Sequence, residues 1–169
     1  MSAIEKENQG ILDLEYQQIE LSQRDVRSLI FHFLYAAEAF DYQESLEVLV
    51  DNLNRGFDIS VSSDDKVFCV ASSVINARNE LDEQIVPLLH NWRFDRVGVC
   101  TKLILRLALW ELNQNVMSPN IIINEAIELA KCFAEKDSYK FINGILDEAV
   151  KNKMMADLQQ PHDALSAQL

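Results

Sequence analysis

The segment from Asp95 to Asn115, DRVGVCTKLILRLALWELNQN, has apolar residues around nearly the whole circumference of a helix. A helix of this kind is buried on most sides, so the rest of the chain has to surround it. Only four glycines and three prolines occur in the 169 residues, a balance typical of helical proteins. The sequence therefore predicts an all-α fold packed around residues 95–115.

Amphipathic stripes predict further helices on both sides of this segment. The first begins at Ser22, where apolar residues recur with the spacing of one helix face. Ser22 can cap this helix, because Asp25 occupies the reciprocal position of a capping box. Similar stripes predict helices over residues 43–54, ending near Gly56, over 118–134, and over 137–152, the last capped by Asp137 or Ser138.

The stretch between residues 62 and 89 fits two arrangements. It can form one long helix capped by Ser62 or Ser63, or a pair of helices separated by a bend. The bend is expected before Pro87 or at the run RNELD, because proline removes a helical hydrogen bond. Together these segments predict six or seven helices and no strand.

The two ends of the chain differ in composition from the segment between them. Residues 1–21 hold five acidic residues and one lysine, which predicts an acidic extension outside the core. Residues 22–152 carry the helical stripes and form the predicted helical domain. Residues 153–169 are polar and include Pro161, so we expect them to form a tail.

Charge and motif content limit the function classes. A formal net charge of −12 opposes non-specific adhesion to nucleic acid, so RNA binding would need a local basic patch or a helping partner. His32, His90 and His162 share no ligand spacing, and the sequence contains no phosphate-binding glycine loop and no nucleophile elbow. We therefore expect a protein that is not an enzyme and that uses no metal and no cofactor.

The cysteines and the apolar runs indicate the compartment. Cys69, Cys100 and Cys132 are far apart, odd in number and set in apolar helical patterns, so we expect reduced thiols in the core rather than disulfides. The N-terminus has no secretory or organellar signal pattern, and no apolar run reaches membrane-spanning length. The sequence predicts a cytoplasmic protein with no membrane partner.

Several polar residues interrupt otherwise apolar helices. Arg106 and Glu111 occur in the segment LILRLALWEL, Glu125 in INEAIELAK, and Asn143 in KFINGILDEA. A charge on a surrounded helix needs a hydrogen-bonded partner or a surface used by another molecule. Internal pairing, such as an arginine–glutamate pair, and direct partner contact both explain these residues.

The ordered runs LILRLALWEL and SPNIIINEAIELAKCFAEKDSYKFINGILDEAVK resemble the C-terminal half of the NusB transcription antitermination family. NWRFDRV and FLYAAEA also resemble family segments, so the similarity covers about residues 22–152. The resemblance implies two three-helix subdomains packed across each other. It further implies a non-catalytic protein that binds boxA-like RNA of rRNA transcripts together with the ribosomal protein NusE, in an antitermination complex on RNA polymerase.

The resemblance also points to site residues. Family members usually begin the first helix with an arginine-rich run, and here SQRDVRS keeps only Arg24 and Arg27 at matching positions. These two arginines, Tyr35 and Lys140 are therefore the expected RNA contacts. Asp137 and Ser138, which match the turn before the last helix, are the expected partner contacts. Their local alternatives are an ordinary solvated first turn for the arginines and helix capping for the turn.

Two readings of function remain open at this point. The chain is an antitermination factor that holds RNA jointly with NusE, or a protein-binding scaffold of the same fold with weakened or lost RNA recognition. The acidic charge favours a basic ribosomal protein as partner, so we expect partner binding to outlast independent RNA binding. Residues 1–21 can act as an acidic competitor for the arginines, and a homodimer through the partner face is a further possibility.

Overall fold

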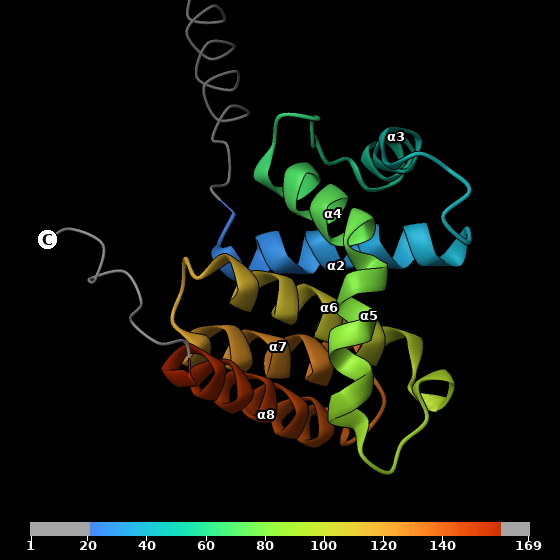
Figure 1. Cartoon of the computed structure of the whole chain (residues 1–169). Coiled ribbons are helices and arrows are strands. Elements are labelled where there is room, and N and C mark those ends of the chain that lie inside the picture. Colours follow the sequence, from blue (N-terminus) through green and yellow to red (C-terminus); the bar gives the residue numbers. More distant parts are fainter. Residues whose placement is uncertain (1–20, 160–169) are drawn as a thin grey trace, which may run out of the picture.

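The computed structural model describes residues 21–159, and helices account for most of this part of the chain (Figure 1). The described residues hold seven α-helices and two short 3-10 helices, and they contain no strand, as the sequence predicts. The helices are α2 (Gln23–Ala39), α3 (Leu46–Phe57), α4 (Lys66–Asn76), α5 (Arg78–Ile85), η1 (Val86–Leu89), η2 (Phe94–Arg96), α6 (Val99–Gln114), α7 (Pro119–Phe133) and α8 (Ser138–Gln159).

The helices form two groups of three. Helices α2, α3 and α4 pack on one another, as do α6, α7 and α8, and α5 leads from the first group to the second. Helix α2 also packs on α6, and Figure 1 shows α2, α6, α7 and α8 stacked one below another. The side chains of Ile104 and Leu105 are fully buried at this junction. The prediction that 95–115 is surrounded by other helices is therefore confirmed, as are the two three-helix subdomains.

The start of α2 has the predicted capping box. The Asp25 backbone N–H donates to Ser22 Oγ at 3.2 Å, and the Ser22 N–H donates to Asp25 Oδ2 at 3.1 Å. These two bonds satisfy backbone donors that a helix start leaves unpaired. Beyond the cap, α2 buries Ile30, Phe33 and Leu34 against its neighbours.

The ends of the next two helices differ from the predictions. Helix α3 begins at Leu46, three residues later than predicted, with Ser45 as its cap, and it continues through Gly56 to a left-handed Asp58. Helix α4 begins after Asp65, not at Ser62 or Ser63. The Asp65 carboxylate instead accepts the Ser62 N–H at 2.6 Å and so closes the turn before the helix. Aspartate tolerates the left-handed conformation and readily bonds nearby backbone, which explains both shifts.

The structure also decides the arrangement of residues 62–89, which the sequence left open, and places the end of α8 later than predicted. The stretch 62–89 is a broken pair: α4 ends at Asn76, α5 follows Ala77, and a 3-10 turn begins at Val86, next to Pro87. Helix α8 continues to Gln159, so the first seven residues assigned to a polar tail are helical. Residues 1–20 and 160–169, which include most of the acidic extension, lie outside the described residues.

The cysteines are free but do not belong to the core. Cys69 and Cys132 are exposed and Cys100 is half-buried, so the prediction of three core thiols is wrong. Each cysteine follows an apolar pattern in sequence, yet it lies at the edge of its buried stripe. Burial and the nearby Glu135 carboxylate raise the pKa of the Cys100 thiol above its usual range.

A buried arginine joins the two groups of helices. Arg106 on α6 is only 6% exposed, and its guanidinium donates to both oxygens of Asp82 on α5, at 2.7 and 2.8 Å. The same guanidinium donates to Glu38 on α2 at 3.0 Å and to the Tyr42 hydroxyl at 2.9 Å. The Tyr42 hydroxyl in turn donates to Glu38. Arg106 therefore pairs internally, with Glu38 and with Asp82.

This network changes the ionisation of its members. Burial alone would raise the pKa of Glu38, but hydrogen bonds from Tyr42 and Arg106 outweigh burial and lower it. Burial and the hydrogen bond to Glu38 raise the pKa of the Tyr42 phenol to about 12. Asp82 and Glu38 also hold the pKa of Arg106 above its usual value, although burial opposes this. At neutral pH the network is therefore one cation between two carboxylates, with a protonated phenol.

We expect the Tyr42 phenol to make stability fall in alkali. The folded chain holds this proton more tightly than the unfolded chain, whose tyrosines titrate near pH 10. The stabilising contribution is therefore complete below about pH 10 and is lost as the pH rises towards 12. Urea unfolding one unit below and one unit above about pH 10 checks this. The natural chain should lose more stability than Tyr42→Phe over this interval, and equal losses would contradict the assignment.

Candidate nucleic-acid interface

The two predicted RNA arginines occupy different environments on α2. Arg24 is exposed, and its guanidinium contacts Glu125 of α7 at 3.3 Å. Arg27 lies one turn later and is only 4% exposed. Its Nε donates to Glu111 of α6 at 3.0 Å, and its Nη2 reaches Met117 Sδ at 3.1 Å. The two side chains therefore point to different helices.

The burial of Arg27 does not fit a direct phosphate contact. Its charge is balanced by Glu111, which comes from the polar residues that interrupt α6 in sequence. A phosphate would have to displace this carboxylate from a largely desolvated site, which is costly. The structure gives Arg27 a packing role between α2 and α6, and of the predicted arginine pair it leaves only Arg24 on the surface. Internal pairing also accounts for Glu111 and Glu125.

Aromatic rings cover the surface between α2 and the end of α7. Tyr35, a predicted RNA contact, is 49% exposed, and its ring centroid lies 6.4 Å from that of Phe31. The Phe31 ring stacks on Phe133 at 4.8 Å, and His32 meets Phe133 edge-on at 5.1 Å. Phe31 is buried and holds the exposed rings in place. Exposed or half-buried rings of this kind are the usual stacking partners of unpaired bases.

The turn between α7 and α8 places the remaining predicted residues next to these rings. Asp137 has a positive φ of 66°, and its carboxylate pairs with the Lys140 amine at 2.8 Å. Ser138 is the first residue of α8, and its hydroxyl donates to Glu135 at 3.2 Å. The Tyr139 ring lies between two amines, 5.6 Å from Lys140 and 5.7 Å from Lys131 of α7. The turn is therefore held by local bonds and still presents cations.

We define the α2–α7–α8 surface by its exposed or half-buried cations and rings. It is made of Arg24, His32, Tyr35, Lys131, Phe133, Tyr139 and Lys140. Helix α7 connects the members, because it pairs with Arg24, stacks Phe133 on α2 and places Lys131 over Tyr139. The structure thus brings Arg24, Tyr35 and Lys140 onto one connected surface, and Asp137 and Ser138 lie at its α8 edge.

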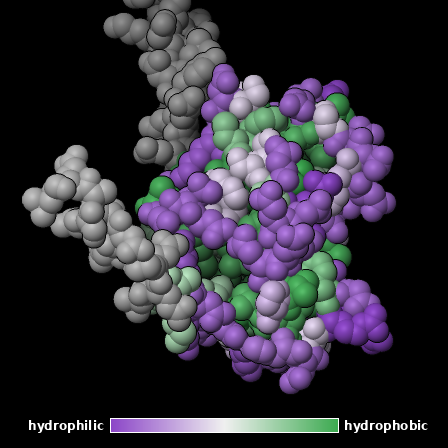
Figure 2. All heavy atoms as spheres, viewed as in Figure 1, coloured by the Kyte–Doolittle hydropathy of each residue, from purple (hydrophilic) through white to green (hydrophobic). Residues whose placement is uncertain are grey.

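The cations of this surface are paired with carboxylates. Glu125 faces Arg24, Glu128 contacts Lys131 at 2.8 Å, and Asp137 contacts Lys140. Hydrogen bonds and charge from these partners raise the pKa of all three bases. Figure 2, viewed from the same side as Figure 1, shows mostly hydrophilic side chains with apolar patches between them, in keeping with the acidic composition. Exposed pairs contribute little to stability, so a phosphate can replace the carboxylate at modest cost.

A cavity lies beside the α7–α8 turn, next to the α2–α7–α8 surface. This cavity of about 400 Å³ is bounded by Trp92, Arg96, Lys136 and the start of α6. Glu135 closes its floor by accepting the Thr101 hydroxyl at 3.1 Å. A Cβ at Gly98 would lie 1.9 Å from the Glu135 carboxylate, so a larger residue there requires Glu135 to move. Glycine at this position lets Glu135 sit against the N-terminus of α6.

Sequence reasoning missed Lys131, Phe133 and Tyr139. All three fall within AKCFAEKDSYKF, the stretch that also supplied Asp137, Ser138 and Lys140. The signal that was available is the alternation of lysines and aromatics in this run. Its meaning depends on α2, because Phe133 acquires its role only by stacking on Phe31. Spacing along one segment cannot reveal such a long-range contact.

Two other kinds of site receive no support from the described residues. In the range 21–159, no cluster of three or more histidine, cysteine or acidic side chains is arranged to hold a metal ion. None of the helices between these limits combines the length and the apolar character needed to cross a membrane.

Comparison with known proteins shows the family of the chain. A model of the NusB family matches residues 24–151. The transcription antitermination protein NusB of Macrococcus caseolyticus is 36% identical over 125 residues, covering 74% of this chain and 90% of that protein. The protein of the same name from Geotalea uraniireducens is 37% identical over 134 residues, covering 75% and 92%.

Solved structures show the same fold. NusB of T. maritima superposes with a TM-score of 0.66 at 28% identity, covering 79% of this chain and 93% of that one. The solution structure of NusB from Aquifex aeolicus gives a TM-score of 0.64, with 86% and 97% covered, and at 21% identity this likeness concerns the fold alone. The family match spans most of the chain, and its relatives are covered almost completely. This chain belongs to the NusB family.

Proposed function

We propose that this protein is a transcription antitermination factor that binds boxA-like RNA of rRNA transcripts together with NusE, as part of a complex on RNA polymerase. Family membership and the names of the relatives support the process. The α2–α7–α8 surface supports the RNA contact, because it combines exposed rings with cations whose carboxylate partners a phosphate can replace. The role requires binding and positioning, with no catalytic step.

The ring stack between α2 and α7 is the observation that carries this proposal. The rings of Phe31, Phe133 and His32 pack on one another where α2 meets α7. Tyr35 remains exposed beside them. Unpaired bases stack on such rings, while Arg24, Lys131 and Lys140 lie near enough on the same surface to meet the phosphates. A single-stranded element of a few nucleotides therefore suits this surface better than a duplex.

The paired cations explain why a protein partner is needed. Each phosphate that binds here has to replace Glu125, Glu128 or Asp137, so the protein alone gains little from charge. The chain as a whole carries −12, which also opposes RNA. A basic partner such as NusE at the α8 edge, near Asp137 and Ser138, supplies the missing positive charge. RNA binding should therefore be strong only in the ternary complex.

The electrostatic part of this proposal predicts the effect of charge reversal. The double change Arg24→Glu and Lys140→Glu should weaken RNA binding to the NusE complex by at least about tenfold. It should also lower the slope of log affinity against log salt, by roughly 0.7 for each lost phosphate contact. Fluorescence titration of boxA RNA at several salt concentrations measures both quantities. Association with NusE in the absence of RNA should persist.

A matched control uses cations away from the surface. Arg55 on α3 and Lys151 on α8 are also exposed, and reversing both gives the same change in net charge. This control should leave the salt slope unchanged. Equal losses in both double variants would show that only net charge matters, which would contradict a local site.

The second candidate function is a scaffold that binds NusE without reading RNA. It is favoured by one observation, the neutralisation of Arg24, Lys131 and Lys140 by neighbouring carboxylates. In this case the same titration shows partner association with no preference for boxA over a scrambled RNA. BoxA selectivity that appears only with NusE, and that falls in the Arg24 and Lys140 variant, supports the antitermination factor instead.

A further inference from the structure

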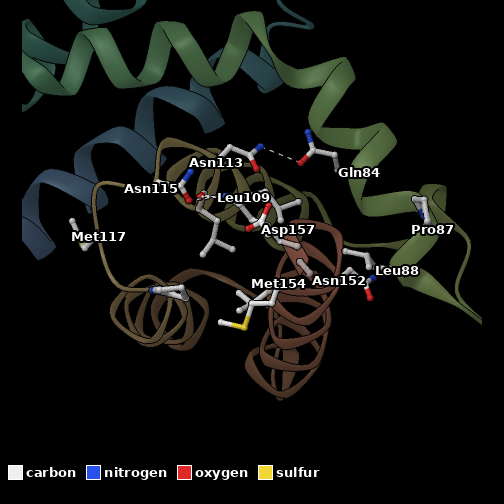
Figure 3. A pocket seen from close by; sticks show the side chains of 15 residues that line it. Gln84, Pro87, Leu88, Leu109, Asn113, Asn115, Met117, Asn152, Met154 and Asp157 are labelled. Atoms are coloured by element: carbon white, nitrogen blue, oxygen red, sulfur yellow. Dashed lines mark hydrogen bonds between the residues drawn. The ribbon is translucent and has the colours of Figure 1, made fainter. Parts of the chain in front are cut away.

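A groove of about 590 Å³ lies on the side of α8 that faces α5 and the end of α6 (Figure 3). Its walls are mainly apolar, and Asn113 donates to Gln84 across one edge at 3.1 Å. The groove is separate from the α2–α7–α8 surface, since none of the residues that define that surface lines it. Its apolar walls come from Leu88, Leu109, Leu112, Met117, Val150 and Met154.

One wall of the groove is built by residues beyond the family match. The match ends at residue 151, whereas α8 continues to Gln159 and lines the groove with Asn152, Lys153, Met154 and Asp157. Lys153 fixes this last part of α8, because its amine donates to Leu112 O at 2.8 Å and to Asn115 Oδ1 at 2.7 Å. Lys153 thereby stabilises the end of α6, whose final carbonyls have no helical partner. The part of α8 that forms this wall is therefore anchored on the end of α6.

The groove is suited to a short segment. Its volume lies in the range of pockets that take a small ligand or a few side chains. A stable dimer buries a broad surface, on the order of 1,200 Å² or more in total, rather than filling one groove with a few side chains. Met154 presents its apolar side chain here and is 56% exposed. A few apolar side chains of a peptide would cover Met154 and fill the space between α5 and α8.

We propose that residues 160–169, QPHDALSAQL, fold back and occupy this groove. The segment follows directly on the helix that forms the wall, and it begins three residues after Asp157. Pro161 disfavours continuation of α8, because it lacks an N–H and restricts Gln160 to extended backbone. Leu165 and Leu169, with Ala164, provide the apolar side chains that match the walls.

The lengths of chain permit this return. The wall from Ala149 to Asp157 is about 12 Å long at 1.5 Å per helical residue. Residues 160–165 span up to roughly 20 Å when extended, so Leu165 can reach the middle of the groove. A short tether also gives the segment an effective concentration in the millimolar range. Even a weak contact is then largely occupied, and a free peptide or a second copy is at a disadvantage.

Methyl NMR of the full chain tests the proposal. The chain has four methionines, of which Met117 and Met154 line the groove, whereas Met155 is 61% exposed and does not line it. Leu165→Asp should shift the methyl signals of Met117 and Met154 and leave those of Met155 and Met1 in place. Adding a synthetic peptide of residues 160–169 should return the two signals. The natural chain should need about tenfold more peptide for any response, because its groove is filled.

A pair of neighbouring variants provides the matched control. Met154→Glu places a charge in the groove and should shift the Met117 signal, whereas Met155→Glu changes the same residue type outside the groove and should not. Circular dichroism checks that both variants keep their helices. Unchanged Met117 and Met154 signals in Leu165→Asp would overturn the proposal. Signals that differ between variants only at high protein concentration would also overturn it, by assigning the groove to a second copy.

Discussion

Replacing Arg106 with methionine is expected to lower the free energy of unfolding by about 4 kcal/mol. Methionine fills a similar volume, so little of the loss comes from a cavity. The loss comes from Asp82 and Glu38, which remain partly buried without the guanidinium that balances them. Urea unfolding followed by circular dichroism measures the difference. A destabilisation of this size would be large for a single substitution.

Companion variants separate charge from packing at Arg106. Adding Asp82→Asn and Glu38→Gln to Arg106→Met should recover part of the stability, because no unpaired carboxylate is then left. Arg93→Met provides the exposed control, since Arg93 pairs with Asp95 on the surface, and its stability should hardly change. If Arg106→Met behaves like Arg93→Met, the network does not hold the two groups of helices together.

Replacing Arg27 with methionine should lower the free energy of unfolding by about 3 kcal/mol, whereas Arg24→Met should leave it nearly unchanged. The two arginines are one turn apart on α2, yet Arg27 is buried against Glu111 and Arg24 is exposed. Urea unfolding of the two variants checks the contrast.

If the proposed function holds, Arg24→Met should weaken RNA binding in the presence of NusE more than Arg27→Met does. Arg24→Met should reduce the salt dependence, and Arg27→Met should retain it as long as the variant remains folded. Equal stability of the two variants would contradict the packing role of Arg27. A loss of salt dependence in folded Arg27→Met would instead restore its assignment as an RNA contact.

Local features of the fold were readable from the sequence. The capping box at Ser22 and Asp25 needs only residues three apart, and the all-round apolar character of 99–114 requires burial whatever surrounds it. The resemblance to NusB, carried by long ordered runs, supplied the grouping of helices. These predictions hold because each depends on interactions within one helix or on a resemblance that extends over many residues.

Other features depend on contacts between distant segments. Sequence reasoning assigned Arg24 and Arg27 the same expected role as RNA contacts, but packing against α6 buries Arg27. The turn before α4 closes on Asp65 because this carboxylate reaches the Ser62 N–H, and several nearby residues offered similar chemistry. The extent of α8 follows from the anchoring of Lys153 on α6, 41 residues earlier. None of these partners can be identified from one segment.

The Arg106 network also joins segments that leave the ribosome at different times during synthesis. Glu38 and Tyr42 precede their arginine by 68 and 64 residues. When α2 leaves the ribosome it has neither this charge partner nor the α6 surface that covers its apolar face. Helices α2, α3 and α4 therefore cannot complete their packing until residue 106 has emerged. The N-terminal half, although made first, depends on the C-terminal half for its final structure.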